Sequence, residues 1–136
     1  QNKIILIVDD ELDILDLFGE CLRSEGYNVH LFTAPTELLE YFYGNPNCSL
    51  VITDYKMPKI GGIDLIKKIR EIDKGFKIKI ILISAYLEHG ITSNYDTNEL
   101  ENLKIDKILE KPIMINELTN IVKELIEIEE PVLKSL

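Results

Sequence analysis

The feature that most constrains the fold of this chain is a regular alternation between short apolar runs and segments with helical periodicity. Three apolar runs are continuous and rich in β-branched residues, as in strands buried on both faces: 3–8 (KIILIV), 49–53 (SLVIT) and 78–84 (IKIILIS). Two weaker runs, 28–32 (NVHLF) and 107–110 (KILE), are also predicted strands. The polar residues interleaved in 28–32 place that strand at an edge of the sheet.

Helices are predicted between these strands. Residues 12–25 carry large apolar side chains at helical spacing, and Gly26 supplies a stop. Further helices are predicted over 36–43, over about 63–70, from about 96 onward, and around 115–125. Because strands and helices alternate, the sequence predicts an α/β fold with a parallel sheet covered on both faces.

Length and charge narrow the class of protein. A chain of 136 residues suits one domain with one sizeable core. No apolar run reaches membrane-spanning length and the first residues show no signal-peptide pattern, so we expect a cytoplasmic protein with no membrane contact. The net charge of -9 argues against direct nucleic-acid binding and is compatible with a cation site or a basic protein partner.

Polar residues follow four of the five predicted strands. In chain order these strand ends are Asp9-Asp10-Glu11, Asp54, Ser84 and Lys111-Pro112. In an open α/β sheet the ligand crevice lies outside the carboxyl ends of the strands. If the first strand is central and the third lies beside it, Asp9, Asp10 and Asp54 converge there.

Three converging carboxylates repel one another, and a hard divalent cation relieves that repulsion. Magnesium is the cation expected, because it prefers oxygen ligands, water and a substrate phosphate. Ser84 and Lys111 would hold phosphate oxygens, and a carboxylate can itself be the nucleophile. Each residue also has a structural explanation, such as a helix cap at Asp9 or a turn at Asp54, but their joint placement favours a site.

The ordered motifs resemble the receiver domain of two-component response regulators, the CheY-like family. They are VDDE (8–11), DYKMPKIGG (54–62), SA (84–85) and KP (111–112), and the resemblance covers about residues 3–128. It implies a single doubly wound (βα)5 flavodoxin-like domain with strand order 2-1-3-4-5. We accordingly expect a receiver domain over 1–128 and a C-terminal tail or start of a linker over 129–136.

The resemblance also implies a role for each carboxylate. Asp54 would be the phosphoacceptor, forming an aspartyl-phosphate. Asp10 and Asp54, with the backbone carbonyl of Lys56, would ligate Mg2+, and Asp9 would act largely through water.

Other residues would hold the phosphoryl group or shape the loop. Lys111 would contact a phosphoryl oxygen and stay near the acceptor in its absence, and Ser84 would hydrogen-bond the group once it arrives. The Lys111-Pro112 bond is cis in this family, and Met57, Pro58 and Gly62 would shape the loop after the acceptor.

As a family member, the chain would be a signalling domain in a phosphorelay and not an enzyme, apart from limited chemistry in its own phosphorylation and autodephosphorylation. The implied partners are a sensor histidine kinase or phosphotransfer protein and a downstream protein or output domain, with a homodimer through the fourth and fifth helices as a further option. Two alternatives stay open. One is a degenerate receiver that acts only as an interaction module. The other is a magnesium-dependent aspartyl-phosphate phosphohydrolase, which typically has an acid where this chain has Lys56.

The chain departs from the family pattern in three places. Ile108 stands where the family has its switch aromatic, three residues before the lysine. The stretch from Ser84 to Lys111 is longer than usual. Lys56 and Tyr86 flank the acceptor, where they could shield a phosphoryl group from water and slow autodephosphorylation.

Overall fold

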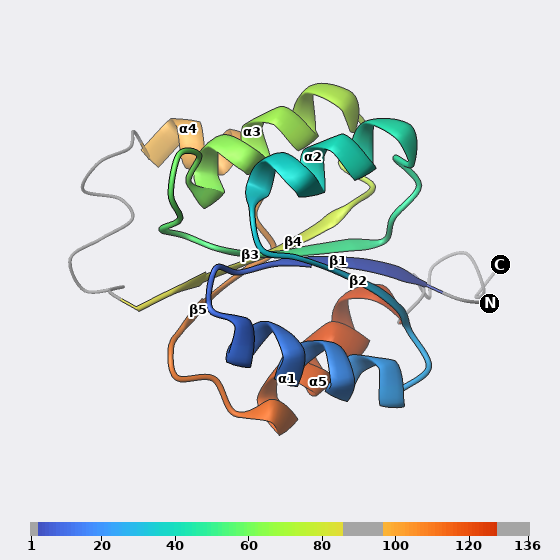
Figure 1. Cartoon of the computed structure of the whole chain (residues 1–136). Helices are drawn as coiled ribbons and strands as arrows, with labels where there is room; N and C mark the ends of the chain where they lie inside the picture. The colour runs from blue at the N-terminus through green and yellow to red at the C-terminus, as the bar shows by residue number, and fades with distance from the viewer. Residues whose placement is uncertain (1–2, 86–96, 128–136) are drawn as a thin grey trace, which may run out of the picture.

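The computed structural model describes residues 3–85 and 97–127, which form a parallel five-stranded sheet with strand order β2-β1-β3-β4-β5 (Figure 1). The strands are β1 (Ile4–Val8), β2 (Asn28–Phe32), β3 (Leu50–Asp54), β4 (Lys79–Ser84) and β5 (Lys107–Glu110). The central position of β1 and β3 explains why their sequences are continuously apolar, since both faces of these strands are covered.

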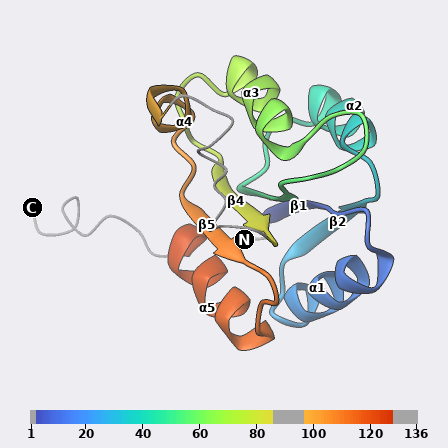
Figure 2. The same cartoon turned by 90° about the vertical axis from the view of Figure 1, so that its left-hand side faces the viewer.

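Helices cover both faces of the sheet. They are α1 (Leu12–Ser24), α2 (Pro35–Gly44), α3 (Gly62–Ile72), α4 (Thr97–Leu103) and α5 (Ile115–Ile126). Two of them, α1 and α5, lie on one face, and α2, α3 and α4 lie on the other, as the views in Figures 1 and 2 agree. Within the described residues, no helix is long and apolar enough to cross a membrane.

Two hydrophobic clusters form the core, one on each face of the sheet. Side chains alternate along β1, so that Ile5 and Ile7 join the cluster under α1 and α5, while Leu6 and Val8 join the cluster under α2 and α3. All four are at most 1% exposed. The two clusters hold the strands rigidly, which fixes the side chains that emerge at the strand ends.

The α/β fold and the strand order expected from the sequence are confirmed. The predicted strands differ from the observed ones by at most one residue at either end, and β2 is an edge strand as predicted. The predicted tail over 129–136 lies outside the described residues, and so does Asp96 at the predicted start of α4.

Candidate functional site

The candidate site lies at the carboxyl ends of three neighbouring strands. Asp9 directly follows β1, while Asp54 and Ser84 are the last residues of β3 and β4. Strand order places β3 between β1 and β4, so that these ends adjoin. All three residues are buried, with exposures of 2% for Asp9, 8% for Asp54 and 2% for Ser84. A buried polar cluster at this sheet edge is the arrangement expected of a binding site.

Lys111 brings a cation into this cluster from the end of β5. Its Nζ lies 3.3 Å from Asp54 Oδ2, 3.4 Å from Asp9 Oδ2 and 2.9 Å from Glu11 Oε1. The backbone N–H of Lys111 donates to the carbonyl of Ser84 at 2.8 Å, which anchors the segment to β4. The Lys111-Pro112 peptide bond is cis, as the resemblance implies. One ammonium group therefore faces three carboxylates.

Burial disturbs the protonation of these groups. Burial and the charge of Asp9 together raise the pKa of Asp54 to about 6, against the opposing effect of Lys111. Burial also raises the pKa of Asp9, although the backbone N–H of Glu11, which donates to Asp9 Oδ1 at 2.8 Å, partly offsets this. Burial lowers the pKa of Lys111, but its hydrogen bond to Glu11 and the nearby carboxylates outweigh burial and raise that pKa. The cluster is thus short of positive charge.

The carboxylates fit a hard divalent cation. Asp9, Glu11 and Asp54 each offer an oxygen, and these three oxygens lie within 4.8 Å of one another. Oxygen ligands with surplus negative charge are what magnesium prefers, and at the open side Glu11 is exposed, which leaves room for water ligands. The residues present therefore fit a magnesium ion.

The ligand set differs in part from the one that the resemblance implies. Asp10 is exposed and does not belong to the group of converging carboxylates, and the side chain of Lys56 is exposed as well. Their roles as metal ligands stay predictions. Glu11 was given no role from the sequence, although it stands in the same VDDE motif. Side chains two residues apart in extended chain point the same way, and this alternation from Asp9 to Glu11 was the available signal.

The loop after Asp54 is held by short-range hydrogen bonds. The N–H of Tyr55 donates to Asp54 Oδ1 at 2.9 Å, and the N–H of Gly62 donates to the carbonyl of Tyr55 at 2.8 Å. Ile60 donates to the carbonyl of Pro58 at 2.8 Å across Lys59, which has a φ of 71°. Such a three-residue turn is strained for a residue other than glycine. The chain after Asp54 is therefore bent tightly back toward α3.

Close packing around position 62 leaves no room for a side chain, so that glycine is required there. A Cβ at this position would lie 2.3 Å from the carbonyl oxygen of Asp54 and 2.9 Å from Leu82 Cδ1. We expect Gly62→Ala to lower the free energy of unfolding by about 1–3 kcal/mol because the backbone of Asp54 must shift. Urea denaturation measures this, with Gly44→Ala as the matched control, since a Cβ at Gly44 meets nothing within 4 Å. Equal stability of the two variants would contradict the close approach.

Comparison with known proteins identifies the family. The family model described as "Response regulator receiver domain" matches residues 5–123, and the chain therefore belongs to the receiver domains of response regulators. The response regulator SaeR of Staphylococcus epidermidis is 32% identical over 114 residues, which is 84% of this chain and 46% of that protein. The two-component response regulator ORR11 of Oryza sativa subsp. indica is 35% identical over 60% of this chain and 55% of its own length. The chain thus spans about half the length of these curated relatives.

Solved structures agree with this assignment. A response regulator receiver domain protein from Clostridium thermocellum has a TM-score of 0.78 at 29% identity, covering 92% of this chain and 94% of that one. The response regulator TrrA of Thermotoga maritima, solved in complex with Mg(2+)-BeF, has a TM-score of 0.73 at 35% identity, covering 90% of this chain and 98% of that one. The expected resemblance is confirmed, and this chain is a receiver domain, a class of signalling domain.

Of the residues that depart from the family pattern, the structure describes Ile108 but not Tyr86. Ile108 lies on β5 with 40% of its surface exposed, so that an aliphatic side chain faces outward where the pattern has an aromatic residue. Tyr86 lies outside the described residues, and its shielding of a phosphoryl group from water stays a prediction.

Proposed function

We propose that this domain accepts a phosphoryl group on Asp54 and signals through a change in its surface that depends on phosphorylation. The observation that carries the proposal is the Asp54 carboxylate, buried at a strand end with Lys111 Nζ 3.3 Å away and with Asp9 and Glu11 beside it. The donor would be a sensor histidine kinase, a phosphotransfer protein or a small acyl phosphate.

In the proposed reaction, an oxygen of the Asp54 carboxylate forms a bond to phosphorus as the bond from phosphorus to the donor breaks. A carboxylate must be ionised to attack, and the pKa of Asp54, raised to about 6, leaves most of it ionised at neutral pH. Lys111 would then hold a phosphoryl oxygen, and the hydroxyl of Ser84, at the end of β4, would donate to another. Both groups are already at the sheet edge that carries Asp54, so that little reorganisation is needed.

A magnesium ion, when bound, would neutralise charge on the phosphoryl group. Asp54 would hold it together with Asp9 or Glu11, whose oxygens converge with those of Asp54. Asp10 and the carbonyl of Lys56 belong to the proposed ligands through the family resemblance. The binding of Mg(2+)-BeF by the similar protein TrrA supports this choice of cation.

The proposal extends to the setting of the domain. We place the receiver over residues 1–128 and a tail or linker over 129–136, in the cytoplasm, where a kinase charged from ATP would meet it. The output would be a downstream protein or an attached domain, and the region of α4 and α5 is a candidate surface for a homodimer. With Ile108 in place of the aromatic residue, the surface change would not involve rotation of a ring at that position.

Intact-mass spectrometry tests the proposal. Incubation with acetyl phosphate and Mg2+ should give an adduct of one phosphate that is lost in Asp54→Asn and in the presence of chelator. Asp64→Asn, which changes an exposed carboxylate in the first turn of α3, should keep the adduct. Fast consumption of acetyl phosphate without a lasting adduct would support the phosphohydrolase instead. If no adduct forms and acetyl phosphate is not consumed, the result would support a domain that acts only by binding.

A further inference from the structure

Four lysines lie close to the amino ends of the strands, at the end of the sheet opposite to Asp54. Lys3 precedes β1, Lys79 begins β4, and Lys74 and Lys77 lie on the connection between α3 and β4. They surround two adjoining hollows, which share Cys48 and Lys77 in their walls. The larger hollow has a volume of about 590 Å³. We call these two hollows together the basic groove.

The walls of the basic groove are partly apolar. Phe42, Cys48 and Ile78 are buried in the larger hollow, and Ile72 stands at its wall with 51% of its surface exposed. Burial also raises the pKa of the Cys48 thiol to about 12, so that it stays neutral and behaves as an apolar group. A ligand that covered Ile72 would gain hydrophobic free energy.

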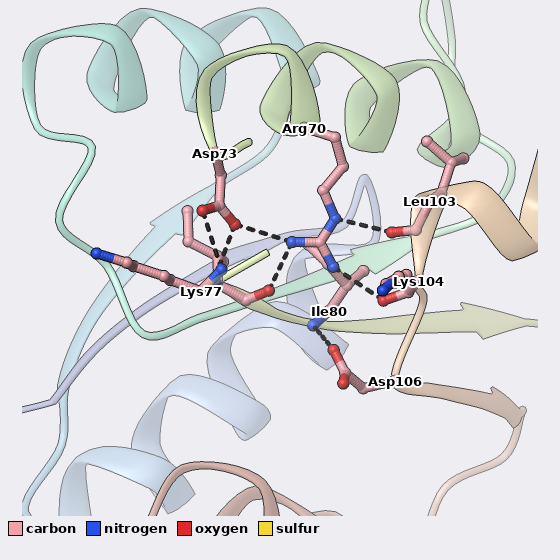
Figure 3. Close-up of polar contacts among 8 residues, drawn as sticks. Arg70, Asp73, Lys77, Ile80, Leu103, Lys104 and Asp106 are labelled. Carbon is pink, nitrogen blue, oxygen red and sulfur yellow. Dashed lines mark hydrogen bonds and ion pairs between the residues drawn. The ribbon is translucent and has the colours of Figure 1, made fainter. Parts of the chain in front are cut away.

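Asp73 is the single acid among the described residues that line the groove, and its charge is directed inward. Its Oδ2 lies 2.9 Å from Arg70 Nη1 and accepts from the N–H of Ile78 at 2.8 Å, while Oδ1 accepts from the N–H of Lys77 at 3.0 Å. Figure 3 shows this carboxylate between the guanidinium and the connection that follows α3. The side chain of Asp73 is only 8% exposed. It therefore braces the connection and offers little charge to the groove.

These four lysines give the basic groove its positive charge. In the part of the chain that the structure describes, no ion pair includes Lys3, Lys74, Lys77 or Lys79. In a chain with a net charge of -9, four neighbouring lysines that form no ion pair with another described residue make a local region of opposite sign. Because Arg70 and Asp73 fix the backbone at Lys77, the charge is presented from an ordered segment. Such a region attracts anionic ligands.

We propose that the basic groove docks an acidic peptide segment of a partner protein that also carries a large apolar side chain. Its carboxylates would pair with Lys74 and Lys77, and its apolar side chain would cover Ile72 in the larger hollow. A nucleic acid fits less well, because its phosphates leave the apolar wall uncovered and the rest of the chain repels it. The groove lies at the amino ends of the strands and Asp54 at a carboxyl end, so that a docked partner leaves the acceptor open. This docking is distinct from the proposed phosphoryl transfer.

Nuclear magnetic resonance titration tests the docking. The probe is the synthetic peptide Glu-Glu-Leu-Glu-Glu-Phe-Glu-Glu, added to the full chain labelled with nitrogen-15. We expect saturable shifts of backbone amides within 47–49, 72–79 and 125–126, in segments that line the groove. The double variant Lys74→Glu, Lys77→Glu should weaken binding on the order of tenfold or more, since two attractive contacts become repulsive.

The matched control is the double variant Lys68→Glu, Lys107→Glu, which makes the same change of charge at exposed lysines outside the groove. It should bind the peptide nearly as well as the wild type. Equal weakening in both double variants would overturn the proposal, since long-range charge alone would explain it. Absence of saturable shifts in the wild type would overturn it as well.

Two further probes separate other occupants. A peptide with serine in place of the leucine and phenylalanine should bind several-fold more weakly. Unchanged affinity would show that the groove binds anions without recognising an apolar side chain. Tighter binding of polyuridylate, or amide shifts in these segments that depend on protein concentration without peptide, would replace the proposed partner by RNA or by a second copy. Both double variants should take up phosphate from acetyl phosphate normally, which shows that they are folded and tests the proposed function separately.

Discussion

Arg70→Met is expected to lower the free energy of unfolding by about 3–5 kcal/mol, the largest effect of any substitution considered for this chain. Arg70 is 8% exposed, and its guanidinium makes four hydrogen bonds. The acceptors are the carbonyls of Leu103 (2.8 Å), Ile78 (2.7 Å) and Lys104 (2.9 Å), and Asp73 Oδ2 (2.9 Å). Methionine fills a similar volume but satisfies none of these groups. It leaves a buried carboxylate without its cation and carbonyls without a donor.

The loss should concentrate at α4. Leu103 is the last residue of α4, and its carbonyl and that of Lys104 would otherwise lack partners at the helix end. Arg70 supplies donors to both from α3, so that it caps α4 from another helix (Figure 3). A helix of seven residues is too short to persist without such support. Faster hydrogen exchange over residues 98–104 than in β1 should therefore accompany the loss of stability.

Urea denaturation and two comparison variants decide whether this account is right. Arg70→Lys keeps the charge but loses the fork of donors, and it should recover only part of the lost stability. Arg23→Met removes the hydrogen bond of an exposed arginine to the carbonyl of Val29 and should cost only about 1 kcal/mol. A loss for Arg70→Met no greater than that for Arg23→Met would mean that the buried network contributes little.

The sheet could be predicted from the sequence because its signals are local. Buried strands such as 50–54 and 79–84 appear as short apolar runs, and the polar residue that closes each run marks the strand end. Because the strands are parallel, Asp54 and Ser84 then lie at the same end of the sheet, where the carboxyl ends of the strands meet. The same reasoning correctly placed β2 at an edge, because its interleaved polar residues signal incomplete burial.

Contacts between distant residues could not be predicted in this way. Glu11 pairs with Lys111 across 100 positions, and Arg70 bonds to Leu103 and Lys104 across 33 and 34. Periodicity placed Arg70 in a helix, but no local pattern says that its guanidinium is buried and caps another helix. The contact of Glu11 with Lys111 was likewise not singled out from the sequence, whereas the role of Asp10 as a metal ligand stays a prediction. Burial and charge pairing across the chain depend on the assembled fold.

Asp54→Asn, measured in chelator, is expected to raise the free energy of unfolding at pH 7 by about 2–3 kcal/mol. Burial and the charge of Asp9 raise the pKa of Asp54 from its ordinary value of 3.8 to about 6 in the folded state. Between these values the folded chain binds more protons than the unfolded chain, so that stability falls as pH rises. Below a pH of about 3.8 the protonated carboxyl of Asp54 costs the folded state nothing. As pH rises past 6 the carboxyl ionises in the folded state, and the full electrostatic cost of the buried charge appears. Asparagine cannot ionise and removes this cost.

The pH dependence of urea denaturation separates this effect from a general change in stability. The wild type should lose stability from pH 4 to pH 7 relative to Asp54→Asn, by about 1.4 kcal/mol for each unit by which the pKa is raised. Asp64→Asn, at an exposed carboxylate of α3, should retain the wild-type profile. Magnesium should stabilise the wild type near neutral pH by binding only the folded state, and Asp54→Asn far less. A wild type that is as stable in chelator at neutral pH as Asp54→Asn would show that Lys111 already balances the buried carboxylates, and the electrostatic reason for a cation would then be gone.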